Sequence, residues 1–168
     1  FIAINQTQID KRLGGQKYWV TLKYDGEYAD IFHDGKQTVT LNRSARVRRG
    51  LPCILEAGEL LDKAKIKEAV VPAEIYYYHD GKRAKLGQLL SACADEKKTA
   101  NLRLPIYDIQ EIEAKPFRTT KYQETYGQIS AIFGNGKLCH PVDMKVANSA
   151  QEVKDIFQKW VLEENHEG

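Results

Sequence analysis

The first part of the chain alternates hydrophobic and polar positions with a period of two, which is typical of half-buried strands. Tyr18, Val20 and Leu22 follow this alternation, and the residues around them favour β structure. The pattern predicts a strand over residues 18–22, with Lys23 at its end.

Two hairpins are predicted from a tetrapeptide that occurs twice. The strand-like runs 28–32 and 37–41 flank His33-Asp34-Gly35-Lys36. Asp-Gly between two such runs indicates a hairpin, because both residues tolerate positive φ. The same tetrapeptide recurs at 79–82, directly after the strand-like run 73–78. We interpret the recurrence as shared turn chemistry and not as a repeat.

Hydrophobic residues at helical spacing predict helices over 55–70, 86–94 and 119–133. A capping box, Ser149-Ala150-Gln151-Glu152, predicts the start of a further helix. Strands are expected over 103–109 and 141–146. Strands with helices packed on them indicate the α+β class, with mixed or antiparallel sheets. No linker or low-complexity stretch interrupts the chain, so we predict one domain over residues 1–168.

Composition indicates an ordinary globular protein, with 168 residues of which 42% are hydrophobic and 29% charged. The net charge of +2 is too small to indicate nucleic acid by itself. Arg43, Arg46, Arg48 and Arg49 nevertheless fall within seven residues. Such a basic segment either binds phosphate or forms a solvated loop, and composition leaves both interpretations open.

Several classes of protein are disfavoured by the sequence. Cys53, Cys93 and Cys139 are too far apart for a metal motif and too few for a disulfide framework, which favours an intracellular setting. No apolar run could span a bilayer, and no signal-peptide pattern is present, so we expect no membrane association. Motifs of P-loop nucleotidases, H-E-x-x-H metalloproteases and G-x-S-x-G hydrolases are absent.

Lys23-Tyr24-Asp25-Gly26 is the sharpest local feature, because it places a lysine at the end of a strand and before a turn. The ordinary interpretation is a surface lysine. The functional interpretation is a nucleophile on a rigid platform, which must lose its proton before it attacks. Burial, neighbouring cations such as the arginine cluster, or a bound metal would favour that loss.

This tetrapeptide resembles the first motif of the covalent nucleotidyltransferases, which are DNA ligases, RNA ligases and capping guanylyltransferases. Further segments match in order: Leu41–Ser44, Pro72–Ile75 (with Ala73 in place of the usual glycine), Pro105–Ile109 and Glu167-Gly168. The chain thus resembles, over nearly its whole length, the adenylation domain of an ATP-dependent DNA ligase. The resemblance implies the ATP-grasp-like nucleotidyltransferase fold of that family.

The resemblance also implies roles. Lys23 would be catalytic and become covalently adenylated by ATP, and Glu167 would bind Mg²⁺. The implied nucleotide-binding residues are Leu22, Asp25, Arg43, Glu74 and Tyr107, with Tyr107 stacked on the purine. The implied partner is nicked double-stranded DNA, in DNA repair or replication, bound by a monomer. Arg46, Arg48 and Arg49 are the candidate contacts to the DNA backbone.

Some features depart from the family pattern. The family often has arginine two residues after the motif glycine, where this chain has Tyr28. A fifth, lysine-containing motif and an OB-fold domain are expected beyond Gly168, so we expect a C-terminally truncated domain with weak or no activity. Alternatives are an RNA ligase, a GTP-dependent capping enzyme, or a nucleic-acid-binding module without catalysis. Each matched residue also has an ordinary structural interpretation, as an exposed loop, strand-end or core residue.

Overall fold

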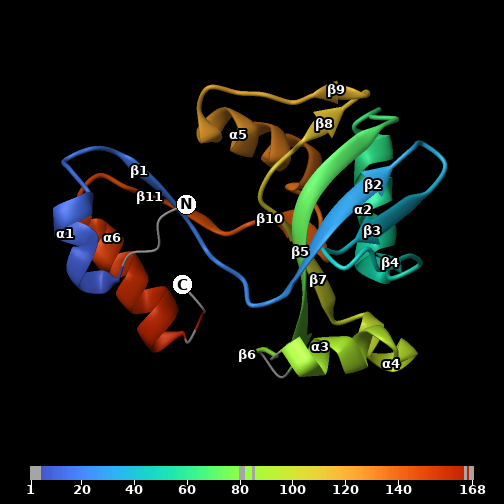
Figure 1. Ribbon diagram of the computed structural model, residues 1–168, viewed down its shortest axis with the longest axis horizontal. Helices are drawn as coiled ribbons and strands as arrows, with labels where there is room; N and C mark the ends of the chain where they lie inside the picture. Colours follow the sequence, from blue (N-terminus) through green and yellow to red (C-terminus); the bar gives the residue numbers. More distant parts are fainter. Residues whose placement is uncertain (1–4, 80–81, 85, 165, 167–168) are drawn as a thin grey trace. The chain divides into compact units, whose positions relative to one another are not determined.

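The computed structural model describes residues 5–79, 82–84, 86–164 and 166. The chain forms two compact units (Figure 1). Unit 1 comprises residues 1–24 and 142–168, and unit 2 comprises residues 25–141. The sequence-based expectation of one domain over residues 1–168 stays a prediction.

Unit 1 is built on a two-stranded antiparallel ribbon. In it, β1 (Tyr18–Thr21) pairs with β11 (Met144–Ala147). Four helical segments complete the unit: η1 (Gln6–Gln8), α1 (Ile9–Arg12), α6 (Ala150–Phe157) and the π-helical η2 (Gln158–Glu163). Helix α1 lies beside α6 (Figure 1), and an ion pair between Asp10 and Lys154 joins them.

The predicted start of α6 is confirmed, with one shift in its capping contacts. The Ser149 hydroxyl accepts a hydrogen bond from the Glu152 backbone N–H at 3.1 Å, as an N-cap residue does. The Glu152 carboxylate, however, accepts from the backbone N–H of Asn148 at 2.9 Å. The return contact of the box is therefore made one residue earlier than the pattern predicts.

The sheet of unit 2 has the strand order β10-β7-β5-β2-β3-β4. Its long central strand is β5 (Ala69–His79), which pairs antiparallel with β2 (Glu27–His33) and β7 (Leu102–Ile106). The strands β3 (Thr38–Leu41) and β4 (Val47–Arg48) extend one side, and β10 (Cys139–Pro141) runs parallel to β7 on the other. Three short strands lie off this path: β6 (Lys82–Arg83), β8 (Glu111–Ile112) and β9 (Lys115–Pro116).

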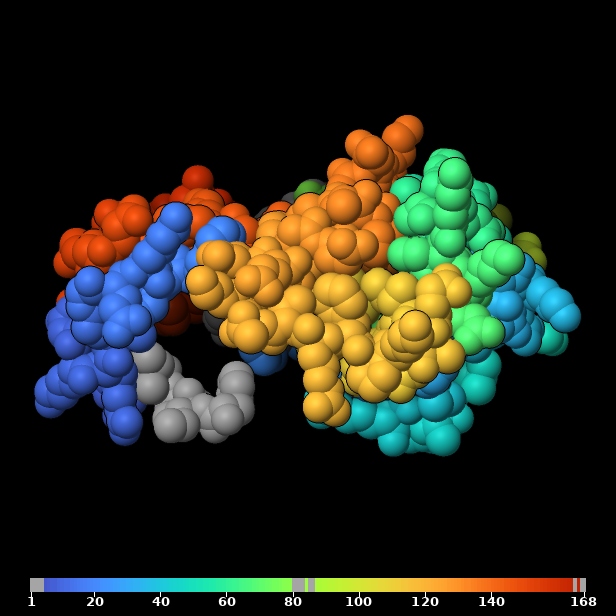
Figure 2. All heavy atoms as spheres, turned by 90° about the horizontal axis from the view of Figure 1, so that it is seen from above, coloured from blue at the N-terminus to red at the C-terminus, as the bar shows by residue number. Residues whose placement is uncertain are grey.

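Helix α2 (Pro52–Lys63) packs on β2, β3 and β7, so the residues of β2 alternate between two environments. Ala29 and Ile31 are buried in the core that includes α2, and Phe32 is exposed on the opposite face. The other helices of the unit are α3 (Leu86–Cys93), α4 (Glu96–Thr99) and α5 (Tyr122–Phe133). Helix α5 packs on α2 and β10, and the two helices lie side by side in Figure 2. Mixed sheets with packed helices confirm the predicted α+β class.

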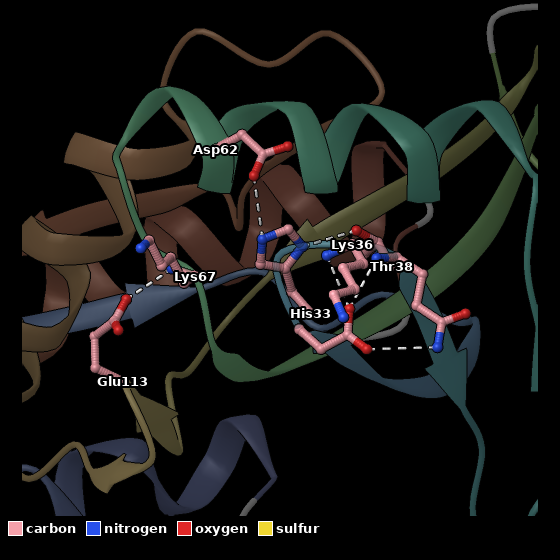
Figure 3. Close-up of polar contacts among 8 residues, drawn as sticks. His33, Lys36, Thr38, Asp62, Lys67 and Glu113 are labelled. Atoms are coloured by element: carbon pink, nitrogen blue, oxygen red, sulfur yellow. Dashed lines mark hydrogen bonds and ion pairs between the residues drawn. The ribbon is translucent and has the colours of Figure 1, made fainter.

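The first predicted hairpin is confirmed, and it is joined to α2 (Figure 3). The Asp34 carboxylate accepts from the backbone N–H groups of Lys36 and Gln37, at 2.9 and 2.8 Å, and Gly35 has a φ of +74°. The buried His33 contacts the Thr38 hydroxyl through Nδ1 at 2.9 Å, and its Nε2 lies 3.4 Å from Asp62 of α2.

The second hairpin is confirmed at its strands, because His79 of β5 pairs with Lys82 of β6. Its predicted turn residues, Asp80 and Gly81, lie outside the described residues.

The prediction of a helix over 55–70 is wrong at both ends. Helix α2 begins at Pro52, since proline is favoured at the first helical position, and it ends at Lys63. The chain then leaves the helix through Lys65, which has a φ of +60°, and β5 begins at Ala69. Apolar residues at 66 and 69–71 fit both a helical and a strand pattern, so periodicity did not locate the boundary.

The predicted strand over 141–146 is two strands in different sheets. Strand β10 ends at Pro141 in unit 2, and β11 begins at Met144 in unit 1. Between them, the backbone carbonyl of Asp143 accepts a hydrogen bond from the Leu22 N–H at 2.9 Å. The boundary between the units therefore falls inside what reads as one continuous strand.

The cysteines form no disulfide: Cys53, Cys93 and Cys139 are all free. Burial raises the pKa of the Cys53 thiol to about 12 and raises that of Cys139 well above its usual value. These two thiols are therefore core residues. Within the described part of the chain, no helix has the length and apolar character needed to cross a membrane.

Candidate functional site

Lys23 lies in unit 1, two residues after β1, which ends at Thr21 and not at the predicted residue 22, and both neighbours of Lys23 are anchored. Leu22 and Tyr24 are both buried, and both contact Asp143. The Leu22 N–H donates to the Asp143 carbonyl, and the Tyr24 hydroxyl donates to its carboxylate at 2.8 Å. Lys23 itself is exposed. Both neighbours of Lys23 are therefore anchored by Asp143, a contact that the sequence did not reveal, and the role of Lys23 as a nucleophile stays a prediction.

The motif glycine is held against β5 in unit 2. The backbone N–H of Gly26 donates to Oε1 of Glu74 at 2.7 Å. A Cβ at this position would lie 2.4 Å from the carbonyl oxygen of Ile75 and 2.9 Å from Cγ of Glu74. The close approach therefore requires glycine. It brings together two segments of the proposed motif set, 48 residues apart, with Asp25 exposed beside them.

Strand register places further polar side chains near Glu74. Tyr28 of β2 lies opposite Glu74 of β5, and Tyr28 and Asp30 share one side of β2 because side chains alternate. The Tyr28 hydroxyl donates to Asp30 at 2.6 Å. The guanidinium of Arg43 lies over the Tyr28 ring, with Cζ 4.9 Å from the ring centroid.

Tyr107 belongs to the same cluster. Burial raises its pKa most, and the charges of Tyr28, Asp30 and Glu74 raise it further, whereas Arg43 lowers it. The predicted residues Arg43, Glu74 and Tyr107 are therefore gathered on unit 2, close enough to influence one phenol.

The backbone around Tyr107 is anchored at the end of β7. Its N–H donates to the Pro72 carbonyl at 3.4 Å, and its carbonyl accepts from the Tyr122 hydroxyl at 3.0 Å. The side chain is half-buried. These contacts hold the backbone from which the ring extends, as the predicted stacking role of Tyr107 requires.

The loop that carries Arg43 is organised by Asn42. The Asn42 side-chain carbonyl accepts from the N–H groups of Ser44 and Arg46, at 3.0 and 2.8 Å, and its amide donates to Glu27. These contacts hold a turn in which Ala45 has a φ of +57°.

The arginine cluster divides into two kinds. Arg48 donates to Glu27 at 2.5 Å, and the two side chains are only 9% and 15% exposed. Burial acts to raise the pKa of Glu27, but hydrogen bonds from Arg48 and Asn42 outweigh it and hold that pKa below its ordinary value. Arg46 and Arg49 are exposed, so they are the better candidates for phosphate contacts.

The predicted metal ligand, Glu167, lies outside the described residues. No group of three or more His, Cys, Asp or Glu side chains suited to a metal ion occurs among the residues that the structure describes. Mg²⁺ binding by Glu167 stays a prediction.

A family model described as an ATP-dependent DNA ligase domain matches residues 3–168. The chain belongs to this family. The resemblance seen in its motifs is thereby confirmed. No curated protein sequence matches the chain significantly.

Solved ligase structures share the fold. A structure described as Pmar-Lig_Pre has a TM-score of 0.69 at 16% identity, over 99% of this chain and 40% of that chain. A putative ATP-dependent DNA ligase from Aquifex aeolicus has a TM-score of 0.57 at 19% identity, over 97% of this chain and 42% of that one. A Lig E DNA ligase has a TM-score of 0.59 at 12% identity, over 92% of this chain and 55% of that one. This ligase domain therefore has the expected nucleotidyltransferase fold, and it spans about 40% of the length of the first two.

Proposed function

We propose that this ligase domain transfers AMP from ATP to Lys23 and then to the 5′-phosphate of a nick in DNA, with residues 1–168 acting as one nucleotidyltransferase domain. The observation that carries the proposal is the cluster of Arg43, Glu74 and Tyr107 on unit 2. Glu74 holds the motif glycine, and the charges of Glu74 and Arg43 both act on the phenol of Tyr107. An acceptor, a cation and an aromatic ring in one place suit a nucleotide.

Each residue has a role that fits its surroundings. The half-buried Tyr107 ring offers a face on which adenine stacks. The carboxylates of Asp25 and Glu74 accept hydrogen bonds from ribose hydroxyls, and charged acceptors make such bonds short and strong. The Arg43 guanidinium binds ribose or phosphate oxygens. The buried Leu22 fixes the strand end beside the nucleophile.

The proposed chemistry begins at Lys23. Its neutral amine attacks the α-phosphorus of ATP, the bond to pyrophosphate breaks, and a phosphoramidate forms as the amine loses its proton. The 5′-phosphate of the nick then attacks this phosphorus, which breaks the P–N bond and frees the lysine. Attack by the 3′-hydroxyl seals the strand and releases AMP. Mg²⁺, when bound, neutralises triphosphate charge, and we assign it to Glu167.

Labelling of the full-length protein tests the first step. We expect label from [α-³²P]ATP, and none from [γ-³²P]ATP, to attach to the protein. Lys23→Ala should abolish it, and so should Lys23→Arg, because a guanidinium does not deprotonate in proteins. Lys97→Ala, at an exposed position on α4, is the matched control and should label normally.

The same assay separates the alternatives. Labelling from GTP instead of ATP would indicate a capping-type enzyme, and sealing of nicked RNA but not nicked DNA would indicate an RNA ligase. Wild-type labelling of the Lys23→Ala variant would contradict the assignment of the nucleophile. A protein that takes no label from either nucleotide would be a binding module without catalysis.

A further inference from the structure

Tyr28 occupies the position at which the ligase family often has arginine, and none of the roles proposed above belongs to it. It is half-buried, and three polar partners surround it. Its hydroxyl donates to Asp30 at 2.6 Å, and the side chain of Gln110 has a small opposing influence on its pKa. The Arg43 guanidinium covers its ring at 4.9 Å.

These contacts fix the phenol in one place and in its neutral form. Burial raises the pKa of Tyr28 to about 12, and the hydrogen bond to Asp30 acts in the same direction. A neutral ring has a negative face that attracts a cation, and Arg43 lies over that face. The ring is therefore a support whose own position is held by the hydrogen bond to Asp30.

Arg43 needs such a support because, among the residues that the structure describes, no hydrogen bond or ion pair holds its side chain, and its guanidinium lies over the Tyr28 ring. Asn42 fixes the backbone of the turn, but the Arg43 side chain is exposed and extends from it. A long exposed side chain loses rotational freedom when it binds a ligand, which weakens binding unless the side chain is already placed. The Tyr28 ring restricts the guanidinium before any nucleotide arrives.

We propose that Tyr28 is a positioning residue for Arg43: its ring holds the Arg43 guanidinium ready for the ribose or phosphate of the nucleotide. This inference rests on the proposed function. The family pattern would favour an arginine at position 28, and this proposal predicts the opposite. An arginine at position 28 would place a second cation beside Arg43 and repel it, so Tyr28→Arg should weaken nucleotide binding.

Calorimetric titration of the full-length protein with ATP tests the proposal. Tyr28→Leu removes the ring, and we expect the Kd for ATP to rise about three- to thirtyfold, the range of a cation–π contact. Tyr28→Phe keeps the ring and should stay closer to wild type than Tyr28→Leu. Tyr28→Arg should bind at least as weakly as Tyr28→Leu. Tyr78→Leu, at an exposed tyrosine of β5, is the matched control and should bind as wild type does.

A double-mutant cycle decides whether Tyr28 acts through Arg43. We expect Tyr28→Leu to have no further effect on the Kd once Arg43 is alanine. Equal losses in both backgrounds would overturn the proposal, as would Tyr28→Arg binding ATP as tightly as wild type or an Arg43→Ala variant with unchanged affinity. Wild-type protein that binds no ATP would instead refute the proposed function, and this inference with it. Thermal unfolding of each variant checks that the changes in Kd do not come from lost structure.

Discussion

The carboxylate of Glu74 accepts a hydrogen bond from the backbone N–H of Gly26 at 2.7 Å, and this contact joins β5 to the glycine that ends the lysine motif. The two residues lie 48 positions apart, yet β2 continues from Gly26 in register with β5, with Glu27 opposite Ile75. Glu74 thus holds the backbone at the start of β2, in addition to the role as a ribose acceptor that we propose for it. A glycine is needed because β5 approaches so closely.

Replacing Gly26 by alanine should therefore damage both the fold and the nucleotide site. The new Cβ would lie 2.4 Å from the Ile75 carbonyl oxygen, so the strand edge has to move and the Glu74 contact is lost. We expect about 1–3 kcal/mol of destabilisation in urea unfolding and weaker ATP binding in calorimetry. Gly127→Ala is the control, since a Cβ there meets nothing within 4 Å. It lies in α5 and should be neutral or stabilising, by up to about 1 kcal/mol. Similar behaviour of the two variants would contradict this account.

Local chemistry explains which parts of the fold could be predicted. The turn after His33 was predictable because Asp34 and Gly35 determine it by themselves. The end of α2 and the break between β10 and β11 could not be predicted, because both depend on which sheet the following strand joins. For the site, the order of short motifs indicated Lys23, Glu74 and Tyr107.

Other contacts of the candidate residues could not be predicted, because they depend on tertiary structure. Asn42, Asp143 and Asp30 look like ordinary polar residues in the sequence. Only the fold places Asp143 beside Tyr24 in unit 1, and, in unit 2, Asp30 beside Tyr28 and Asn42 within the turn that carries Arg43. Arg48 could not be distinguished from Arg46 and Arg49 for the same reason. Its ion pair with Glu27 exists only because β4 is placed two strands from β2.

That difference among the arginines gives a test of DNA binding. Joint replacement of the exposed Arg46 and Arg49 by serine should weaken binding to all DNA sequences alike. The slope of log affinity against log salt should flatten by about 0.9 for each lost phosphate contact. Arg48→Ser should instead reduce stability, because it leaves Glu27 mostly buried without its cation. Salt titrations of DNA binding measure the first effect, and urea unfolding measures the second.

The control for this test replaces Lys97 and Lys98 of α4, which removes the same charge from an exposed helix. An unchanged salt slope in the Arg46/Arg49 variant would assign these residues to a solvated loop.

Glu56 should make the stability of unit 2 depend on pH in the acid range. Its carboxylate, on α2, accepts from the backbone N–H groups of Lys137, Leu138 and Cys139, at 3.0, 2.5 and 2.6 Å. Burial acts to raise its pKa, but these hydrogen bonds outweigh it, so the pKa is lowered from 4.5. A group of this kind stabilises the fold above its unfolded pKa, and the stabilisation is lost as the pH falls through the folded pKa.

We therefore expect Glu56→Ala to cost about 1–3 kcal/mol at pH 7, because the part-buried N–H groups of Leu138 and Cys139 lose their acceptor. The difference from wild type should shrink as the pH falls below about 4.5. Urea unfolding at pH 7, 5 and 3 measures it. Glu59→Ala, at an exposed position on the same helix, should show neither effect. A difference that stays constant with pH would mean that the Glu56 charge has no part in this contact.

The Tyr107 ring should contribute to nucleotide binding through its face and not through its hydroxyl. Tyr107→Phe keeps the face and should retain ATP affinity, while Tyr107→Leu should lose about 1–3 kcal/mol, the range for stacking of a base on an aromatic side chain. That loss corresponds to a rise in Kd of about five- to 150-fold. Calorimetry with ATP measures both variants. Inorganic tripolyphosphate, which has no base, is the control ligand, and its affinity should be the same in wild type and Tyr107→Leu. A variant that loses ATP and tripolyphosphate equally would show that Tyr107 supports the site by packing under Arg43 and Glu74 and does not stack on adenine.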